Sequence, residues 1–488
     1  MLNINLSART GGETLAGGVC MKRILRRSTL IFILTLGFIG GMGYLTFQLI
    51  MNADDWVDQP YNAHIAGSGG LAQAGAIYDR NGEVLAQTVD GVRVYNENDS
   101  IRKSLLHVVG DNSLNISTAA QSMYRSQLAG YNLFWGLNMP ESLRSSNDLT
   151  LTVDAKTCAA AYDVLSSYDK KGACVVYNYK TGEVICSVST KGYDPNSPPE
   201  ITEENESEYE GVYLDNVLSS SYTPGSIFKI VTAAAAIENI PDIYERTWSC
   251  DGSEDIGGSD VTCVEAHGTI NFEQAMAYSC NIVFAELAVE LGADKMTETA
   301  ERIGINMSFE VDGVKTAKGV YDVSDANTNQ LAWSGVGQYN DKVNPMQMAI
   351  ICGAIANGGK ATEPTLIKNA TDSVLSAIGI NKSGNGREMF SESTASQLDS
   401  IMRYTITDYY GDDLFGGLTV CAKTGTGEVG EDKEPNGWMV GYSKDEDCPL
   451  AFACVVEDSG FGFTYAGPVV EAAMIQAAKS LGASAVTG

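Results

Sequence analysis

The pattern of apolar and polar positions divides the chain into one long apolar segment near the N-terminus and a series of shorter elements. Residues 30–51 form an apolar run without a charge, about the ~20 residues that a membrane-spanning helix needs. Two β-hairpins follow. One covers residues 75–86 and turns at Asn81–Gly82, and the other joins residues 173–178 to 183–189.

Helical and strand-like segments then alternate to the end of the chain. A helix over residues 281–291 is expected to stop at Gly292. The other predicted elements are helices over 226–239 and 468–481 and strands over 418–429, 437–443 and 450–457. Strands beside a cluster of helices predict an α/β fold in which a mixed sheet carries flanking helices. We expect a small juxtamembrane domain over residues 52–154 and a large domain over residues 155–485.

Charges on either side of the apolar run predict its orientation. Basic residues precede it and acidic residues follow it: Lys22, Arg23, Arg26 and Arg27, then Asp54, Asp55 and Asp58. The positive-inside rule then places residues 1–29 in the cytoplasm and the rest of the chain outside. A cleaved signal peptide is the alternative, but the run is long for one and no small-x-small site follows closely. An uncleaved single-pass anchor in the plasma membrane is therefore expected.

Composition narrows the class of protein further. Hydrophobic residues make up 44% of the 488 residues, which excludes disorder as the main state. The formal net charge of -29 repels polyanions, so nucleic-acid binding is not expected. Ten of the 11 cysteines follow the apolar run. Cys250 and Cys263 flank a short polar loop and are the one expected disulfide pair, whereas the others are interpreted as small buried side chains.

Several kinds of chemistry lack support in the sequence. The chain has three histidines, and His267 alone lies in the large domain, in a polar loop without a G-x-S-x-G motif nearby. His267 is interpreted as structural. There is no H-E-x-x-H, C-x-x-C or P-loop pattern, so neither a metal nor a cofactor is expected.

A serine activated by a lysine remains. The pattern S-x-x-K occurs three times, as Ser100/Lys103, Ser167/Lys170 and Ser226/Lys229. Only the last copy opens a helix after Pro-Gly and continues into an apolar stretch. Positions i and i+3 share a helix face, so Lys229 can reach the hydroxyl of Ser226. A neutral lysine serves as a general base when burial or a second cation lowers its pKa.

Two further elements complete a candidate site. Lys423, Thr424, Gly425 and Thr426 form K-T-G-T inside a strand-like run, where a glycine allows a ligand to approach the backbone. A second K-T-G, which begins at Lys180, is better explained as a hairpin turn. Ser279–Cys280–Asn281 supplies S-x-N at the break between two helical segments. Each motif alone is weak evidence for an active site, whereas the three motifs in this order are far more specific evidence.

The motifs S-x-x-K, S-x-N and K-T-G-T resemble those of the penicillin-recognising serine enzymes, and the chain resembles a class B penicillin-binding protein. Further matches lie between residues 75 and 485, among them Tyr222–Ser226, Val343–Ala349 and Trp438–Tyr442. The resemblance implies the β-lactamase and transpeptidase type of α/β fold. It also implies a D,D-transpeptidase that cross-links peptidoglycan stem peptides through an acyl-serine and is inhibited by β-lactams.

The resemblance also implies a role for each candidate residue. Ser226 is the nucleophile, Lys229 takes its proton, and Ser279 relays a proton to the leaving amine. Asn281 hydrogen-bonds the substrate amide, and Lys423, Thr424 and Thr426 bind the terminal carboxylate. The backbone N–H groups of Ser226 and Thr426 would form the oxyanion hole.

The implied substrates are stem peptides and a lipid-linked precursor polymer, and the implied partner is a membrane glycosyltransferase. Residues 52–154 are a candidate dimerisation surface. Alternative functions are a β-lactamase, a D,D-carboxypeptidase, a β-lactam sensor, or a non-catalytic scaffold of the wall-synthesis complex. The anchor and the extra domain argue against a β-lactamase, and the single membrane span argues against a sensor. The complete set of motifs argues against a pure scaffold.

Overall fold

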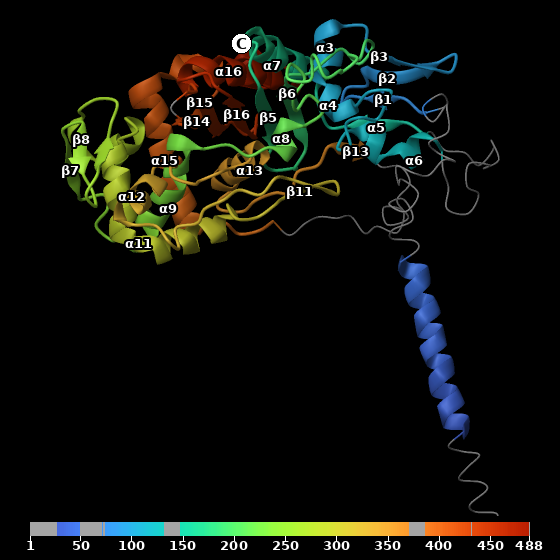
Figure 1. Ribbon diagram of the computed structural model, residues 1–488, viewed down its shortest axis with the longest axis horizontal. Helices are drawn as coiled ribbons and strands as arrows, with labels where there is room; N and C mark the ends of the chain where they lie inside the picture. The colour runs from blue at the N-terminus through green and yellow to red at the C-terminus, as the bar shows by residue number, and fades with distance from the viewer. Residues whose placement is uncertain are drawn as a thin grey trace, which may run out of the picture.

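The computed structural model describes residues 27–48, 71, 74–130, 147–369, 386–430 and 432–487. Arg27–Gln48 forms one helix of 22 residues that is long and apolar enough to cross a membrane. Nearly all of its side chains are exposed, and Figure 1 shows it apart from the folded part of the chain. The helix begins three residues before the predicted run. Apart from Arg27, the charges that predicted its orientation lie outside the described residues.

A five-stranded antiparallel sheet forms the centre of the large folded part, in the order β14-β15-β16-β5-β6. Its strands are β5 (Gly172–Asn178), β6 (Val184–Thr190), β14 (Val420–Gly427), β15 (Asn436–Ser443) and β16 (Leu450–Val456). Nearly every residue of these strands is buried, because helices cover both faces. Burial on both faces explains why β16 and most of β5 are continuous apolar runs. The predicted second hairpin is confirmed as β5 and β6, whose connection contains Gly182 at φ +84°.

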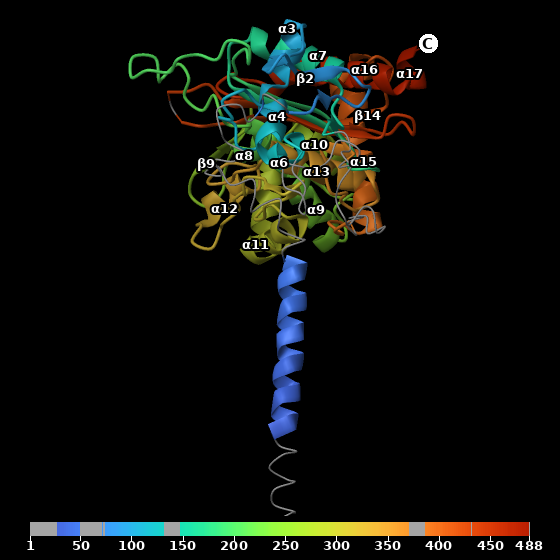
Figure 2. The ribbon, with the colours of Figure 1, turned by 90° about the vertical axis from the view of Figure 1, so that its right-hand side faces the viewer.

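Two layers of helices enclose this sheet (Figures 1 and 2). On one face lie α7 (Ala155–Ser167) and α16 (Gly462–Leu481), which pack against each other and against the strands. The other face carries α9 (Lys229–Asn239), α11 (Asn281–Ile303), α13 (Pro345–Ala356) and α15 (Glu392–Thr405). A separate hydrophobic core fills each of the two spaces between sheet and helices. The predicted mixed α/β fold with flanking helices is confirmed.

The first hairpin belongs to a second sheet of five strands, in the order β13-β4-β1-β2-β3. Its strands are β1 (Ile77–Tyr78), β2 (Val84–Val89), β3 (Val92–Tyr95), β4 (Leu149–Leu151) and β13 (Ile367–Asn369). β13 comes from more than 200 residues after β4 and pairs with it in an antiparallel sense. A strand from the large predicted domain therefore completes the sheet of the small one. The domain boundaries at residues 52, 154 and 485 stay predictions.

Two predicted helix ends differ from the structure. The last helix begins at Gly462 rather than at Pro468, and the proline lies inside it. A proline inside a helix removes one backbone hydrogen bond and is favoured only in the first turn, which is why the helix was predicted to begin there. Gly292 does interrupt α11 with non-helical φ and ψ, as expected, but the chain turns back into a helix and continues to Ile303.

Shorter elements connect these layers. The helices are α3 (Asp99–Ser104), α4 (Leu106–Val109), α5 (Ala120–Met123), α6 (Arg125–Leu128), α8 (Asn216–Ser219), η2 (Gly225–Phe228), α10 (Phe272–Ala277), α12 (Thr328–Ser334), η3 (Ile406–Tyr410), η4 (Asp412–Phe415) and α17 (Ser484–Thr487). The strands are β7 (Thr247–Cys250), β8 (Ser253–Asp255), β9 (Asp260–Thr262), β10 (Gly268–Asn271), β11 (Glu310–Val311) and β12 (Val314–Lys315).

Candidate active site

Ser226 lies at the start of the helix predicted for it, in a turn of 3₁₀ helix, η2, that leads directly into α9. Lys229 is the first residue of α9, and its Nζ lies 3.0 Å from Ser226 Oγ. The tight turn before it requires Gly225, which has φ +55° and whose missing Cβ would overlap the carbonyl oxygen of Thr426. The same glycine therefore sets the helix entry and lets β14 approach Ser226 closely.

Lys229 Nζ has further partners from the S-x-N segment. The backbone oxygen of Ser279 lies 2.6 Å from it and Asn281 Oδ1 lies 2.7 Å from it. Carbonyl oxygens only accept hydrogen bonds, so these two partners take two N–H groups of the amine. A neutral lysine then directs its lone pair at the remaining neighbours, which include the Ser226 hydroxyl. The geometry is that of a base poised to take the proton of Ser226.

Burial adjusts the basicity of both lysines. Lys229 is fully buried, and this burial lowers its pKa to about 7, against the opposing influence of the nearby thiols of Cys280 and Cys263. Burial also lowers the pKa of Lys423 well below its usual value, and the charge of Lys229 lowers it further. Two lysines so close together disfavour double protonation, so a neutral Lys229 is available near neutral pH.

Ser279 connects the two lysines. It lies between α10 and α11, its Oγ is 3.1 Å from Lys229 Nζ, and it accepts a hydrogen bond of 2.9 Å from Lys423 Nζ. Its φ of +58° is in the left-handed region, which is uncommon for a serine and is typical of residues held in place by their surroundings. Asn281 begins α11, and its Nδ2 donates to the backbone oxygen of Thr262 at 2.8 Å.

The K-T-G-T residues lie on β14, at the edge of the central sheet. Lys423 and Gly425 are buried, whereas Thr424 and Thr426 are half-buried, as alternation along a strand requires. A Cβ on Gly425 would lie 2.7 Å from the backbone oxygen of Pro224, so a glycine is needed for β14 to pack against the start of η2. The motif that begins at Lys180 lies in the hairpin turn between β5 and β6, as expected, and two strands separate β5 from β14 in the sheet.

The structure therefore brings together the eight residues predicted from the three motifs. It also adds residues that the sequence analysis did not find. The hydroxyl of Tyr410 bonds Thr424 Oγ1, and Gln338 Nε2 donates to the backbone oxygen of Thr426 at 3.4 Å. No pattern in the sequence links Tyr410 to K-T-G-T, because the contact joins separate elements.

Gly337 packs against Gly225, the residue before Ser226, and we expect Gly337→Ala to disturb the position of Ser226. Gly337 has φ +84°, its oxygen accepts from the Gly225 N–H at 2.9 Å, and a Cβ there would overlap the oxygen of Gly225. The substitution should lower both the melting temperature and the rate of acylation by penicillin. Gly258→Ala is the matched control, because Gly258 has φ +87° but open space around it. It should cost only about 1–2 kcal/mol, as expected of an alanine in the left-handed conformation. Equal effects of the two substitutions would contradict this explanation.

The structure corrects the expected pairing of Cys250 with Cys263. Both thiols are free, and Cys263 Sγ lies 3.7 Å from Cys280 Sγ instead. The reason is that Cys280, which immediately precedes α11, also faces Cys263. His267 is close to this cluster, with its Nδ1 3.3 Å from Cys250 Sγ.

The model of the penicillin binding protein transpeptidase domain matches residues 172–475, which is more than half of the chain. The chain belongs to this family. The match covers the central sheet and every residue of the candidate site. The predicted family, a class B penicillin-binding protein, is thereby confirmed.

Curated relatives and solved structures agree with this assignment. The peptidoglycan D,D-transpeptidase PbpA of Mycolicibacterium smegmatis is 26% identical over 333 residues, which cover 63% of this chain and 67% of that protein. Penicillin-binding protein 3 of Bacillus subtilis is 28% identical over 409 residues, which cover 77% of this chain and 58% of that protein. The chain thus spans somewhat more than half of the length of these relatives.

The fold is similar to that of solved transpeptidase domains. The D,D-transpeptidase domain of a peptidoglycan glycosyltransferase from Eggerthella lenta superposes with a TM-score of 0.70 at 27% identity, covering 84% of this chain and 99% of that one. Penicillin-binding protein A of M. tuberculosis, in its penicillin G acyl-enzyme complex, gives a TM-score of 0.68 at 24% identity, covering 83% and 99%.

Proposed function

We propose that this chain is a peptidoglycan D,D-transpeptidase that cross-links stem peptides through an acyl-serine intermediate. The contacts of Lys229 carry the proposal. Its amine lies 3.0 Å from Ser226 Oγ, while two carbonyl oxygens occupy its N–H groups. Such a base needs no histidine and no metal to activate the serine. Family membership and the names of the relatives support the same reaction.

In the first half-reaction, Ser226 Oγ attacks the carbonyl carbon between the two terminal D-alanines, and its proton passes to Lys229. The peptide C–N bond then breaks, and the departing amine of D-alanine takes a proton through Ser279, whose Oγ lies near both lysines. In the second half-reaction, the amine of a neighbouring stem peptide attacks the ester. This step forms a new amide and returns the proton to Ser226.

The remaining residues bind and orient the substrate. We assign the terminal carboxylate to Lys423, Thr424 and Thr426, and the substrate amide to Asn281. A carboxylate beside Lys423 favours its protonated form and offsets the burial that lowers its pKa. The backbone N–H groups of Ser226 and Thr426 are the proposed oxyanion hole, and each such donor stabilises the transition state by about 2.7–4 kcal/mol. Gly425 allows this approach to the backbone.

The proposal places the enzyme at the plasma membrane. The helix Arg27–Gln48 supports a single-pass anchor. The basic residues before it in the sequence favour a cytoplasmic N-terminus, and the catalytic domain, residues 155–485, would then lie outside. Lipid-linked precursor polymer and stem peptides are the substrates there, and a membrane glycosyltransferase is the proposed partner. Residues 52–154 are the proposed pedestal and a surface for homodimer formation.

The fate of penicillin tests this function against its rivals. The full-length chain in detergent is incubated with penicillin G, while intact mass and free drug are followed together. We expect one drug per chain as a lasting adduct and consumption that stops at one equivalent. Continued consumption without an adduct would indicate a β-lactamase, and intact drug without an adduct would indicate a scaffold. Either result would overturn the proposal.

Acylation should also depend on pH through Lys229. Only the neutral amine accepts the serine proton, and burial lowers the pKa of Lys229 to about 7. The acylation rate constant should therefore rise with increasing pH through about 7 and level off above it. The measurement is the rate of adduct formation with penicillin at a series of pH values. A profile without this rise would contradict a general base with that pKa.

A further inference from the structure

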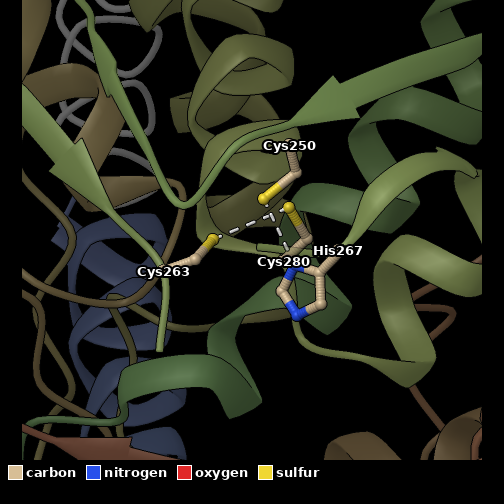
Figure 3. A group of neighbouring side chains, drawn as sticks. All are labelled: Cys250, Cys263, His267 and Cys280. Atoms are coloured by element: carbon tan, nitrogen blue, oxygen red, sulfur yellow. Dashed lines mark hydrogen bonds between the residues drawn. The ribbon is translucent and has the colours of Figure 1, made fainter. Parts of the chain in front are cut away.

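Four potential metal ligands converge next to the S-x-N segment. Cys250 ends β7, Cys263 follows β9, His267 precedes β10, and Cys280 precedes the first residue of α11. Their sulfur and ring nitrogen atoms all lie within 4.8 Å of one another. Figure 3 shows the four side chains pointing toward one another from separate segments of the chain. The transpeptidase chemistry proposed above uses none of them.

The distances within this cluster fit a tetrahedral metal site. Cys263 Sγ lies 3.7 Å from Cys280 Sγ, and Cys250 Sγ lies 3.3 Å from His267 Nδ1. Zinc binds sulfur at about 2.3 Å and imidazole nitrogen at about 2.0–2.1 Å, so neighbouring ligand atoms of a tetrahedron are about 3.4–3.8 Å apart. A disulfide would need sulfur atoms at about 2.05 Å. The cluster is thus spaced for a shared ion rather than for a bond between two of its sulfurs.

The surrounding backbone holds the ligands in place before an ion arrives. β7 and β10 pair with Cys250 opposite Gly268, which brings His267 next to Cys250. The N–H of Asn281 donates to Cys263 Sγ at 3.1 Å. A hydrogen bond from the backbone to a ligating sulfur is the kind of outer contact that orients metal ligands. Cys250 and Cys280 are buried, while Cys263 and His267 are half-buried, which leaves a route for an ion to enter.

We propose that Cys250, Cys263, His267 and Cys280 bind one Zn²⁺ ion in a structural Cys₃His site. Three thiols each lose a proton to solvent as the ion binds, and His267 binds as the neutral imidazole through Nδ1. Three thiolates and one imidazole complete the four-coordinate shell that structural zinc prefers. The sulfur-rich set excludes the hard cations Mg²⁺ and Ca²⁺, which take oxygen ligands.

The position of Cys280 gives the ion a second consequence, which rests on the proposed function. Cys280 lies between Ser279 and Asn281, and Ser279 holds a left-handed backbone conformation. An ion that joins Cys280 to β7 and to the loop before β10 would fix the S-x-N segment against the strands beside it. Cys280 is then a positioning residue for Ser279 and Asn281, two partners of Lys229.

Native mass spectrometry of the full-length chain in detergent tests the site. After loading with zinc alone and removal of excess ion, we expect one zinc per chain. Cys250→Ser combined with Cys263→Ser should abolish binding, and His267→Leu should weaken it at least tenfold in competition with a chelator. His267→Cys, which restores a fourth ligand, should bind again. Cys448→Ser, outside the cluster, should bind as the wild type does.

Three results would overturn the zinc site: no bound ion in the wild type, equal binding in all variants, or a loss of two mass units from a bond between Cys263 and Cys280. Iron in place of zinc would overturn the choice of metal. The effect on catalysis is measured separately. Acylation should be at least tenfold slower after chelation, and both added zinc and His267→Cys should restore its rate. Unchanged acylation would overturn the positioning role alone. Zinc binding is measured by mass, so the proposed zinc site is tested even if the chain forms no acyl-enzyme.

Discussion

Ser226→Ala should remove the penicillin adduct completely and lower the rate of any residual drug turnover by at least about 10⁴-fold. The substitution deletes the only atom that we expect to be acylated, the Oγ within 3.0 Å of Lys229 Nζ. Ser226 is half-buried, and the smaller side chain of alanine fits the same space, so the fold should be unchanged. Intact mass after incubation with penicillin G measures the adduct, and the melting temperature reports the fold.

Ser167→Ala is the matched control for this result. Ser167 also begins an S-x-x-K pattern, but it is exposed at the end of α7, and its Oγ donates to the Val164 oxygen at 2.6 Å. It should form the adduct as the wild type does. A persistent adduct in Ser226→Ala would show that another nucleophile is acylated and would contradict the assignment of Ser226.

Lys229→Met should slow acylation by about 10²–10⁴-fold, the usual contribution of a positioned general base. Methionine fills a similar volume but cannot accept the proton of Ser226. The rise of acylation through pH 7 should vanish in this variant, because the group with the lowered pKa is gone. Stopped-flow acylation by a chromogenic β-lactam measures both effects. A lower melting temperature is also expected, since the oxygens of Ser279 and Asn281 lose their donor.

Lys180→Met tests whether any lysine of a K-T-G triplet has such effects. Lys180 is exposed, lies in the turn between β5 and β6, and donates to Asn357 Oδ1 at 2.8 Å. Its replacement should leave acylation and its pH profile unchanged. If the acylation rate of Lys229→Met still rose with pH through 7, the general base would have to be another group.

The parts of the site that the sequence could predict are those encoded by short spacings. Ser226 and Lys229 are three residues apart at a helix start, so helix geometry alone places them together. The strand-like runs likewise predicted β14, β15 and β16, and the apolar residues of β16 form a continuous run because both faces of the sheet are covered. The meeting of Ser279 and Lys423 with Lys229 came from the family resemblance, because no local rule joins residues so far apart.

The sequence analysis could not predict contacts between segments that are far apart in the chain. β13 completes the sheet of β1 to β4, and Tyr410 reaches Thr424, although nothing in either local pattern indicates a partner. The cysteine cluster is the clearest case. Its ligands are spaced by 13, 4 and 13 residues, which matches no short metal motif, so a structural His267 and a disulfide between Cys250 and Cys263 were expected. The proposed zinc site differs from the absence of metal expected from the sequence.

Transfer of an acyl group to an amine tests the central claim most directly. The full-length chain is given a stem pentapeptide ending in D-alanyl-D-alanine together with a labelled D-amino acid as acceptor, and the products are separated by mass. The account predicts release of one D-alanine and a tetrapeptide joined to the labelled acceptor, in the wild type and not in Ser226→Ala. Release of D-alanine with only the hydrolysed tetrapeptide would indicate a carboxypeptidase and would contradict the account.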